Sequence, residues 1–92
     1  MEERYRYNEA SYDALNRAGV GWVAAHDVLY GERKVRRHLG SGLNIAGQAR
    51  DGRWISVTLI EEEADDEYLV VGARELDPAE AATVARLLGG HS

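Results

Sequence analysis

The sequence predicts an α+β fold: an antiparallel sheet of four to five strands, two N-terminal helices and one C-terminal helix. Apolar residues recur at helical spacing near both ends, apolar and polar residues alternate through the middle, and Asp51-Gly52 marks a tight turn between two alternating runs. Because 92 residues suffice for one modest core, we expect a single domain over residues 1–92.

The N-terminal third predicts a short strand followed by two helices. The alternating segment Arg4–Tyr7 is typical of a strand, and Asn8 can cap a helix that runs to about Arg17. Gly19 supplies the left-handed residue that ends this helix. A second helix of about nine residues is expected between two glycines. The glycines are Gly21 and Gly31, and the expected buried stripe consists of Trp22, Ala25, Val28 and Leu29.

A basic segment follows, with four lysines or arginines within residues 33–38. If it is extended, alternation places Arg33, Val35 and Arg37 on one face. Lys34 and Arg36 then lie on the other face. Since neither face can be buried across its width, we expect an edge strand, where charges also discourage pairing with other chains.

The strongest local pattern is a hairpin joined by Asp51-Gly52. This pair is typical of a two-residue type I′ turn, because both central residues of that turn need positive φ. Such a turn predicts a register with Gln48 opposite Ile55 and Ala46 opposite Val57. The expected core face of the second strand consists of Ile55, Val57 and Leu59.

The C-terminal part predicts an exposed loop, a last strand and a last helix. Residues 61–67 carry six carboxylates and no base, which is typical of a solvated loop. Residues 68–75 alternate as a strand, with Val71 and Ala73 on one face and Val70 and Arg74 on the other. The helix that follows has Asp77 as its cap, Pro78 at its first position and Gly89 just past its end.

The residue inventory narrows the chemistry. The chain has no cysteine, which excludes disulfides and cysteine-based catalysis or metal sites. Its three histidines fall in different predicted segments without metal-ligand spacing, so we expect neither a metal nor another cofactor. No apolar run is long enough to span a bilayer and no signal peptide is recognised, so the expected location is the cytoplasm, with no membrane partner.

Arginine chemistry is what remains. A guanidinium group presents a fork of donors that matches phosphate, and grouped arginines can stabilise a charged transition state without a metal. Arg53 and Arg74 are expected on neighbouring positions of the sheet, with a separate cluster at Arg33, Lys34, Arg36 and Arg37. The alternative is that these are solvated side chains of an edge strand with no ligand.

Three stretches in this order resemble the BrnT family of toxins from bacterial toxin–antitoxin pairs: YNEASYDALNRAGVGWVAAHDVLYG, GQARDGRWISVTL and YLVVGARELDPAEA. The resemblance spans about residues 5 to 86. It implies a RelE-like α+β fold, metal-independent ribonuclease activity and a partner antitoxin with a ribbon-helix-helix DNA-binding domain. It also implies two catalytic residues that hold the scissile phosphate: Arg53 matches the family's hairpin arginine, and Arg74 matches the first arginine after the terminal strand's alanine.

The chain departs from the family pattern at three positions. Ala18 stands in place of a histidine, Gly72 in place of a serine and Glu75 in place of a second arginine. A base or acid candidate and one phosphate-binding cation are therefore missing. These departures bear on activity more than on fold.

The leading interpretation is a BrnT-like toxin component that binds RNA, with ribonuclease activity as the further step that the resemblance implies. In this interpretation Arg53 and Arg74 hold the phosphate, and the basic segment contacts the RNA backbone. An alternative is a non-catalytic protein-interaction module of the same fold, which binds a partner through the basic segment or the acidic loop. A third is an α+β domain whose role the sequence does not disclose.

Overall fold

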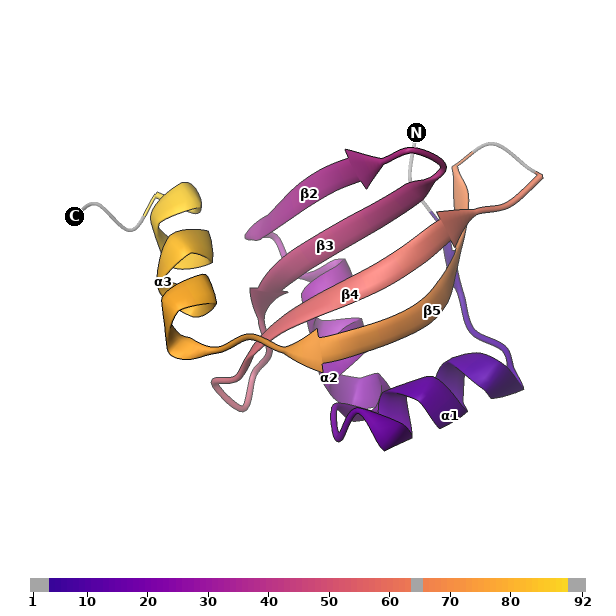
Figure 1. The fold of residues 1–92 in the computed structure, drawn as a ribbon, viewed down its shortest axis with the longest axis horizontal. Helices are drawn as coiled ribbons and strands as arrows, with labels where there is room; N and C mark the ends of the chain where they lie inside the picture. The colour runs from indigo at the N-terminus through magenta and orange to yellow at the C-terminus, as the bar shows by residue number, and fades with distance from the viewer. Residues whose placement is uncertain (1–3, 64–65, 90–92) are drawn as a thin grey trace.

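The computed structural model describes residues 4–63 and 66–89, which form one sheet and three helices (Figure 1). The elements are β1 (Arg4–Arg6), α1 (Glu9–Arg17), α2 (Gly21–Tyr30), β2 (Lys34–Leu39), β3 (Gly42–Gln48), β4 (Trp54–Glu61), β5 (Glu67–Glu75) and α3 (Pro78–Leu87). The strand order is β1-β5-β4-β3-β2. Neighbouring strands are antiparallel except β1 and β5, which are parallel. The predicted α+β class and the edge position of the basic strand β2 are confirmed.

The core lies between α1, α2 and one side of the sheet, here called the covered face. Ile55, Val57 and Leu59 of β4 are fully buried there, as predicted. They pack in one cluster with helix residues that include Leu15 and Leu29. Figure 1 shows α2 behind the sheet and α1 beside β5, while α3 stands at one end. The opposite side of the sheet is here called the open face.

Local capping explains where α1 and α3 begin. Asn8 accepts a hydrogen bond from the backbone N–H of Ser11, and Asp77 does the same for Glu80, so both predicted N-caps are confirmed. Gly19 has a φ of 73°, as expected after α1. The predicted burial of Trp22 is wrong, because α2 packs its small residues Ala24 and Ala25 against the sheet while Trp22 is 52% exposed.

The predicted type I′ turn of the central hairpin is wrong. Gly52 has a positive φ of 96°, but Asp51 does not. The N–H of Gly52 donates to the carbonyl of Ala49, and the N–H of Ala49 donates to Arg53. This is a three-residue loop, in which a turn is followed by a left-handed glycine. The register is therefore shifted by one residue, so that Ile45 rather than Ala46 lies opposite Val57.

A β-bulge corrects the predicted faces of β5. Thr58 pairs with Gly72 but Leu59 pairs with Val70, which leaves Val71 as the extra residue. Val70 is consequently buried on the covered face, whereas Arg74, opposite Ser56, lies on the open face. Uninterrupted alternation would have put Val70 and Arg74 on the same face.

The acidic run is only in part the loop that was predicted. β4 extends to Glu61 and β5 begins at Glu67, and the N–H of Glu62 donates to the carbonyl of Glu67. Arg6 of β1 reaches this end of the sheet, with its Nη1 atom 3.1 Å from a Glu62 carboxylate oxygen. Residues 64 and 65 of the predicted loop lie outside the described residues.

Candidate nucleic-acid interface

The middle of the open face is a polar strip across β3 and β4. Asn44 lies opposite Thr58 in the register, and Ser56 is one row away. The Asn44 amide donates to the Ser56 hydroxyl at 2.7 Å and to the Thr58 hydroxyl at 3.4 Å. These hydrogen bonds fix three small polar side chains on a rigid part of the sheet.

One arginine stands on each side of this strip. Arg37 of β2 lies opposite Asn44, and Arg74 of β5 lies opposite Ser56, so both side chains are on the open face. Because β2 and β5 are three strand spacings apart, their backbones are about 14 Å from each other. Within residues 4–63 and 66–89, Arg37 makes no hydrogen bond or ion pair.

Arg74 is engaged by α3. Its Nη1 and Nη2 atoms donate to the two carboxylate oxygens of Glu80, at 2.7 and 2.5 Å. These bonds lower the pKa of Glu80 to about 2 and raise the pKa of Arg74. Glu80 is therefore ionised at neutral pH and occupies the fork with which Arg74 could bind a phosphate.

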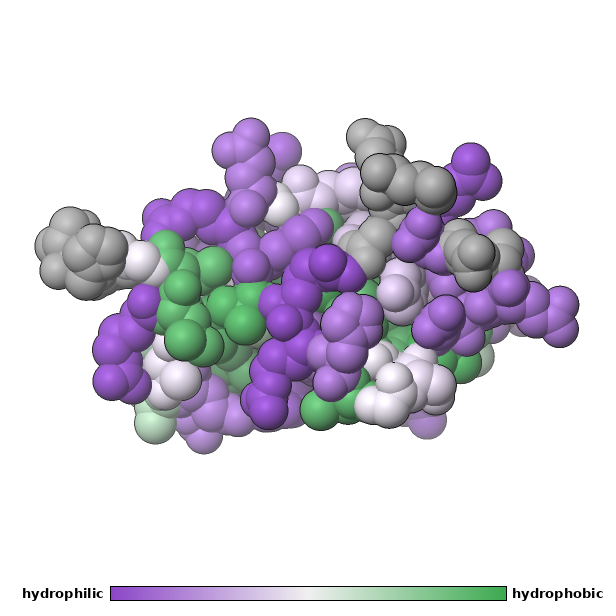
Figure 2. All heavy atoms as spheres, turned by 90° about the horizontal axis from the view of Figure 1, so that it is seen from above, coloured by the Kyte–Doolittle hydropathy of each residue, from purple (hydrophilic) through white to green (hydrophobic). Residues whose placement is uncertain are grey.

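Helix α3 turns this part of the open face into a groove of about 250 Å³. Its apolar lining residues are Val35, Ala46, Leu76, Val84 and Leu87. No residue of α3 is buried, and Leu87 is 66% exposed. Figure 2 shows apolar side chains, in green, gathered beside α3 with hydrophilic ones next to them. The groove thus has an apolar wall on α3, and its floor on the sheet combines the apolar Val35 and Ala46 with polar and cationic side chains.

Arg53 does not lie beside Arg74. Its Nη atoms donate to the carbonyls of Gly19 and Val20 in the connection between α1 and α2, at 2.9 and 3.2 Å. Its Nε donates to Asp51, and hydrogen bonds from Arg53 lower the pKa of that carboxyl. The structure therefore does not bring together the two arginines that were expected to hold one phosphate. The Arg53 hydrogen bonds instead connect the β3–β4 hairpin to the α1–α2 connection on the covered face.

The basic segment divides between the two faces, as its alternation predicts. Arg33 and Arg37 are on the open side, where Arg33 donates to the carbonyl of Leu88 at 2.7 Å. Lys34 donates to the carbonyl of Leu29 beneath the sheet and lies 5.6 Å from the centre of the Tyr5 ring. Arg36 lies opposite Ile45, on the covered face. Only two of the four cations therefore lie on the same face as Arg74.

The groove is better equipped to bind a phosphate than to move a proton. Among the described residues that line it, Glu80 is the one carboxylate and there is no histidine. A carboxylate with a pKa of about 2 is a weak general base at neutral pH. Sequence reasoning missed Glu80 as the partner of Arg74, because the pairing depends on how α3 packs against the sheet. It also missed the polar strip, which alternation in β3 and β4 could have indicated.

Two further observations concern the described residues. No group of three or more histidine, cysteine, aspartate or glutamate residues among them could hold a metal ion. None of their helices is long and apolar enough to cross a membrane.

Together, the sheet order, the paired N-terminal helices and the open polar face define an α+β domain with a BrnT-like fold. A solved structure that shows this fold is the crystal structure of the ribonuclease toxin BrnT of Brucella abortus. The TM-score is 0.61 at 11% sequence identity, over 82% of this chain and 97% of that chain. No protein-family model and no curated protein matches the chain.

Proposed function

We propose that the chain is the toxin component of a toxin–antitoxin pair and a BrnT relative, and that it binds RNA across the open face. The observation that carries the proposal is the placement of Arg37 and Arg74 on the same face, on either side of the Asn44–Ser56–Thr58 strip. The fold supports it, because the similar structure is a ribonuclease toxin.

Binding would proceed through the RNA backbone. One phosphate contacts Arg37, and another replaces the Glu80 carboxylate on Arg74. The hydroxyls of Ser56 and Thr58 and the Asn44 amide supply shorter polar contacts between them. Lys34 and Arg36 add positive potential near the edge of the sheet, while Arg33 lies at the end of the groove next to α3.

Cleavage of the bound RNA, without a metal, is the further step of the proposal. Arg74 is the group that would stabilise the developing negative charge once Glu80 has left it. Arg53 has a structural role in this proposal, because its guanidinium holds the α1–α2 connection rather than the groove. The partner in this proposal is an antitoxin of the ribbon-helix-helix type.

The binding experiment measures the affinity of a fluorescently labelled single-stranded RNA by anisotropy at several salt concentrations. We expect Arg37→Ala and Arg74→Ala each to weaken binding and to reduce the salt slope by about 0.7, the value for one phosphate contact on a single strand. Arg17→Ala is the matched control, because this substitution removes the same charge from α1. Among the described residues, the Arg17 side chain bonds only to the carbonyl of Asp13 in its own helix. Equal losses in all three variants would count against a site in the groove.

Cleavage is tested by expressing the protein alone and following growth and RNA integrity, with purified protein assayed in the presence of a chelator. The proposal expects growth arrest and RNA cleavage that the chelator does not prevent, and loss of both in Arg74→Ala. Normal growth with intact RNA would exclude the ribonuclease activity and leave the proposed RNA binding.

The apolar wall of the groove supports a second candidate function, which is docking of a protein partner without catalysis. Val84 and Leu87 of α3 face an unfilled part of the groove, and Leu87 is largely exposed. Co-expression with a ribbon-helix-helix antitoxin tests this. Leu87→Ser, which shortens the apolar side chain without adding charge to the groove, should abolish the complex while leaving RNA affinity within twofold. Unchanged complex formation would exclude α3 as the docking site.

A further inference from the structure

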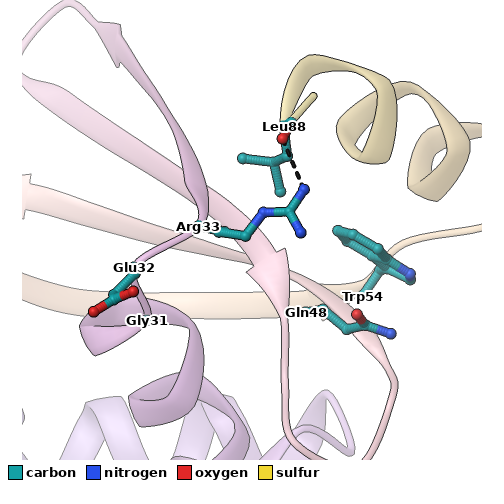
Figure 3. Close-up of a pocket in the computed structure, with 6 residues that line it drawn as sticks. All are labelled: Gly31, Glu32, Arg33, Gln48, Trp54 and Leu88. Atoms are coloured by element: carbon teal, nitrogen blue, oxygen red, sulfur yellow. Dashed lines mark hydrogen bonds between the residues drawn. The ribbon is translucent and has the colours of Figure 1, made fainter. Parts of the chain in front are cut away.

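A second pocket, of about 340 Å³, continues the open face beyond the groove. Gln48 and Trp54 form its floor as register partners, one row from Ala46 and Ser56 on the same side of the sheet. One row of a strand is two residues, or about 7 Å. The pocket is lined further by Arg33 and by Leu88 at the end of α3 (Figure 3).

The side chains of this pocket combine an aromatic ring with a guanidinium and an amide. Figure 3 shows the Arg33 guanidinium directed toward Leu88 and Trp54, with the Gln48 side chain below them, while the Glu32 carboxylate points away. One Nη of Arg33 is held by the Leu88 carbonyl, which fixes the orientation of the fork. The Gln48 amide nitrogen donates to the carbonyl of Gly52, which leaves its oxygen as an acceptor for a ligand.

Such a set of groups suits a nucleobase. An unstacked base presents a π face that stacks on tryptophan or on a guanidinium plane, and an edge that carries both donors and acceptors. Trp54 offers the ring, the remaining N–H groups of Arg33 offer donors, and the Gln48 oxygen accepts. A phosphate alone would use only the arginine.

We propose that the Trp54–Arg33–Gln48 pocket is a subsite for one unstacked base of the RNA whose backbone lies in the groove. The inference rests on the proposed function, because it takes the ligand of the groove to be RNA. The Ser56–Arg74 row would hold the phosphate, and the next row would hold the base of the same strand. The groove then gives affinity, and the pocket gives selectivity for nucleic acid over other polyanions.

The test compares two single-stranded oligonucleotides of equal length and charge, one with bases and one abasic. A Trp22→Phe background leaves Trp54 as the one tryptophan of the chain, since the sequence has two. We expect the base-bearing strand to quench Trp54 fluorescence and to bind about fivefold to 150-fold more tightly than the abasic strand, the range of a base–aromatic stack. Trp54→Ala should abolish this difference, and Trp54→Phe should retain most of it.

The outcomes separate this subsite from the groove. Trp22→Ala, which changes a tryptophan on α2, should leave both affinities unaltered. If both strands bind equally and salt-dependently, the base subsite is overturned and the groove stands. If neither strand binds, the proposed function fails and the subsite fails with it.

Discussion

The two faces of the sheet are built from the same strands but carry different side chains, apolar and buried on the covered face and polar in the middle of the open face. On the covered face, Ile45, Ile55 and Val57 lose all contact with water. Asn44 and Ser56 alternate with these residues along the same strands and lie on the open face, where the Asn44 amide donates to the Ser56 hydroxyl. Because side chains alternate along a strand, each buried core residue of these strands is next to a residue of the face that the proposed function places against RNA.

Two arginines illustrate the separation. The side chain of Arg53 is 31% exposed and donates to two backbone carbonyls as well as to the Asp51 carboxylate, whereas that of Arg74 is 60% exposed and donates to the carboxylate of Glu80. A carbonyl partner belongs to the fold and cannot leave. A carboxylate on a neighbouring helix can be replaced by another anion. We therefore assign Arg53 to stability and Arg74 to binding.

The largest expected effect is the loss of a covered-face side chain. Ile55→Ala should lower the free energy of unfolding by about 2–5 kcal/mol, because it leaves a cavity in a fully buried site. Thr58→Ala on the open face of the same strand should cost less than about 0.5 kcal/mol. Urea denaturation measures both, and similar losses would contradict the division between the faces.

The second prediction compares the loss of Arg53 with the loss of Arg74. Arg53→Ala should cost about 1–3 kcal/mol of stability, because the Gly19 and Val20 carbonyls lose charged donors. Its effect on RNA affinity should be within twofold. Arg74→Ala should cost at most about 1 kcal/mol, since its pair is exposed, while weakening RNA binding about tenfold. The assignment fails if Arg53→Ala is the variant that loses RNA without losing stability.

The third prediction concerns the carboxylate that occupies Arg74. Glu80→Gln removes the competing charge but keeps a side chain that can accept from the N–H of Asp77, so α3 should remain capped. RNA affinity should rise severalfold. Glu75→Gln, which removes the same charge from the end of β5, is the control and should have the smaller effect. A fall in affinity on removing the Glu80 charge would show that this carboxylate helps the ligand instead of competing with it.

The smallest expected effect is on pH dependence. The hydrogen bonds from Arg74, with a smaller contribution from the backbone N–H of Asp77, lower the pKa of Glu80 from 4.5 to about 2 in the folded protein. A carboxyl whose pKa is lower in the folded state than in the unfolded state stabilises the fold at pH values above its unfolded-state pKa. This contribution is lost as pH falls through its folded-state pKa. As pH is lowered from 4.5 to 2, the unfolding midpoint of the wild-type protein should therefore decrease by more than that of Glu80→Gln. Parallel curves would indicate that the pair adds nothing to stability.

The comparison also shows which features local sequence can predict. The caps at Asn8 and Asp77 and the alternation of β2 were predicted, because each depends on residues within a few positions of one another. The hairpin register was not, since Asp51-Gly52 is compatible with loops of two or three residues and burial of Ile45 decides between them.

The composition of the site depended on longer-range packing. The bulge at Val71 turns Arg74 outward, and it follows from the need to bury both Val70 and Ala73 on the covered face. The pairing of Arg74 with Glu80 depends on where α3 stands against the sheet. The separation of Arg53 from Arg74 follows from the same bulge, since Arg53 is two residues from the buried Ile55 while Arg74 lies opposite Ser56 on the open face.

The most direct test of the account is a titration of isotope-labelled protein with single-stranded RNA, followed by amide chemical shifts. We predict shifts concentrated on Arg37, Asn44, Ser56, Thr58 and Arg74, with those of Gly19, Val20 and Arg53 unchanged. Shifts concentrated on the α1–α2 connection around Arg53, with the open face unchanged, would contradict the claim that this face binds RNA.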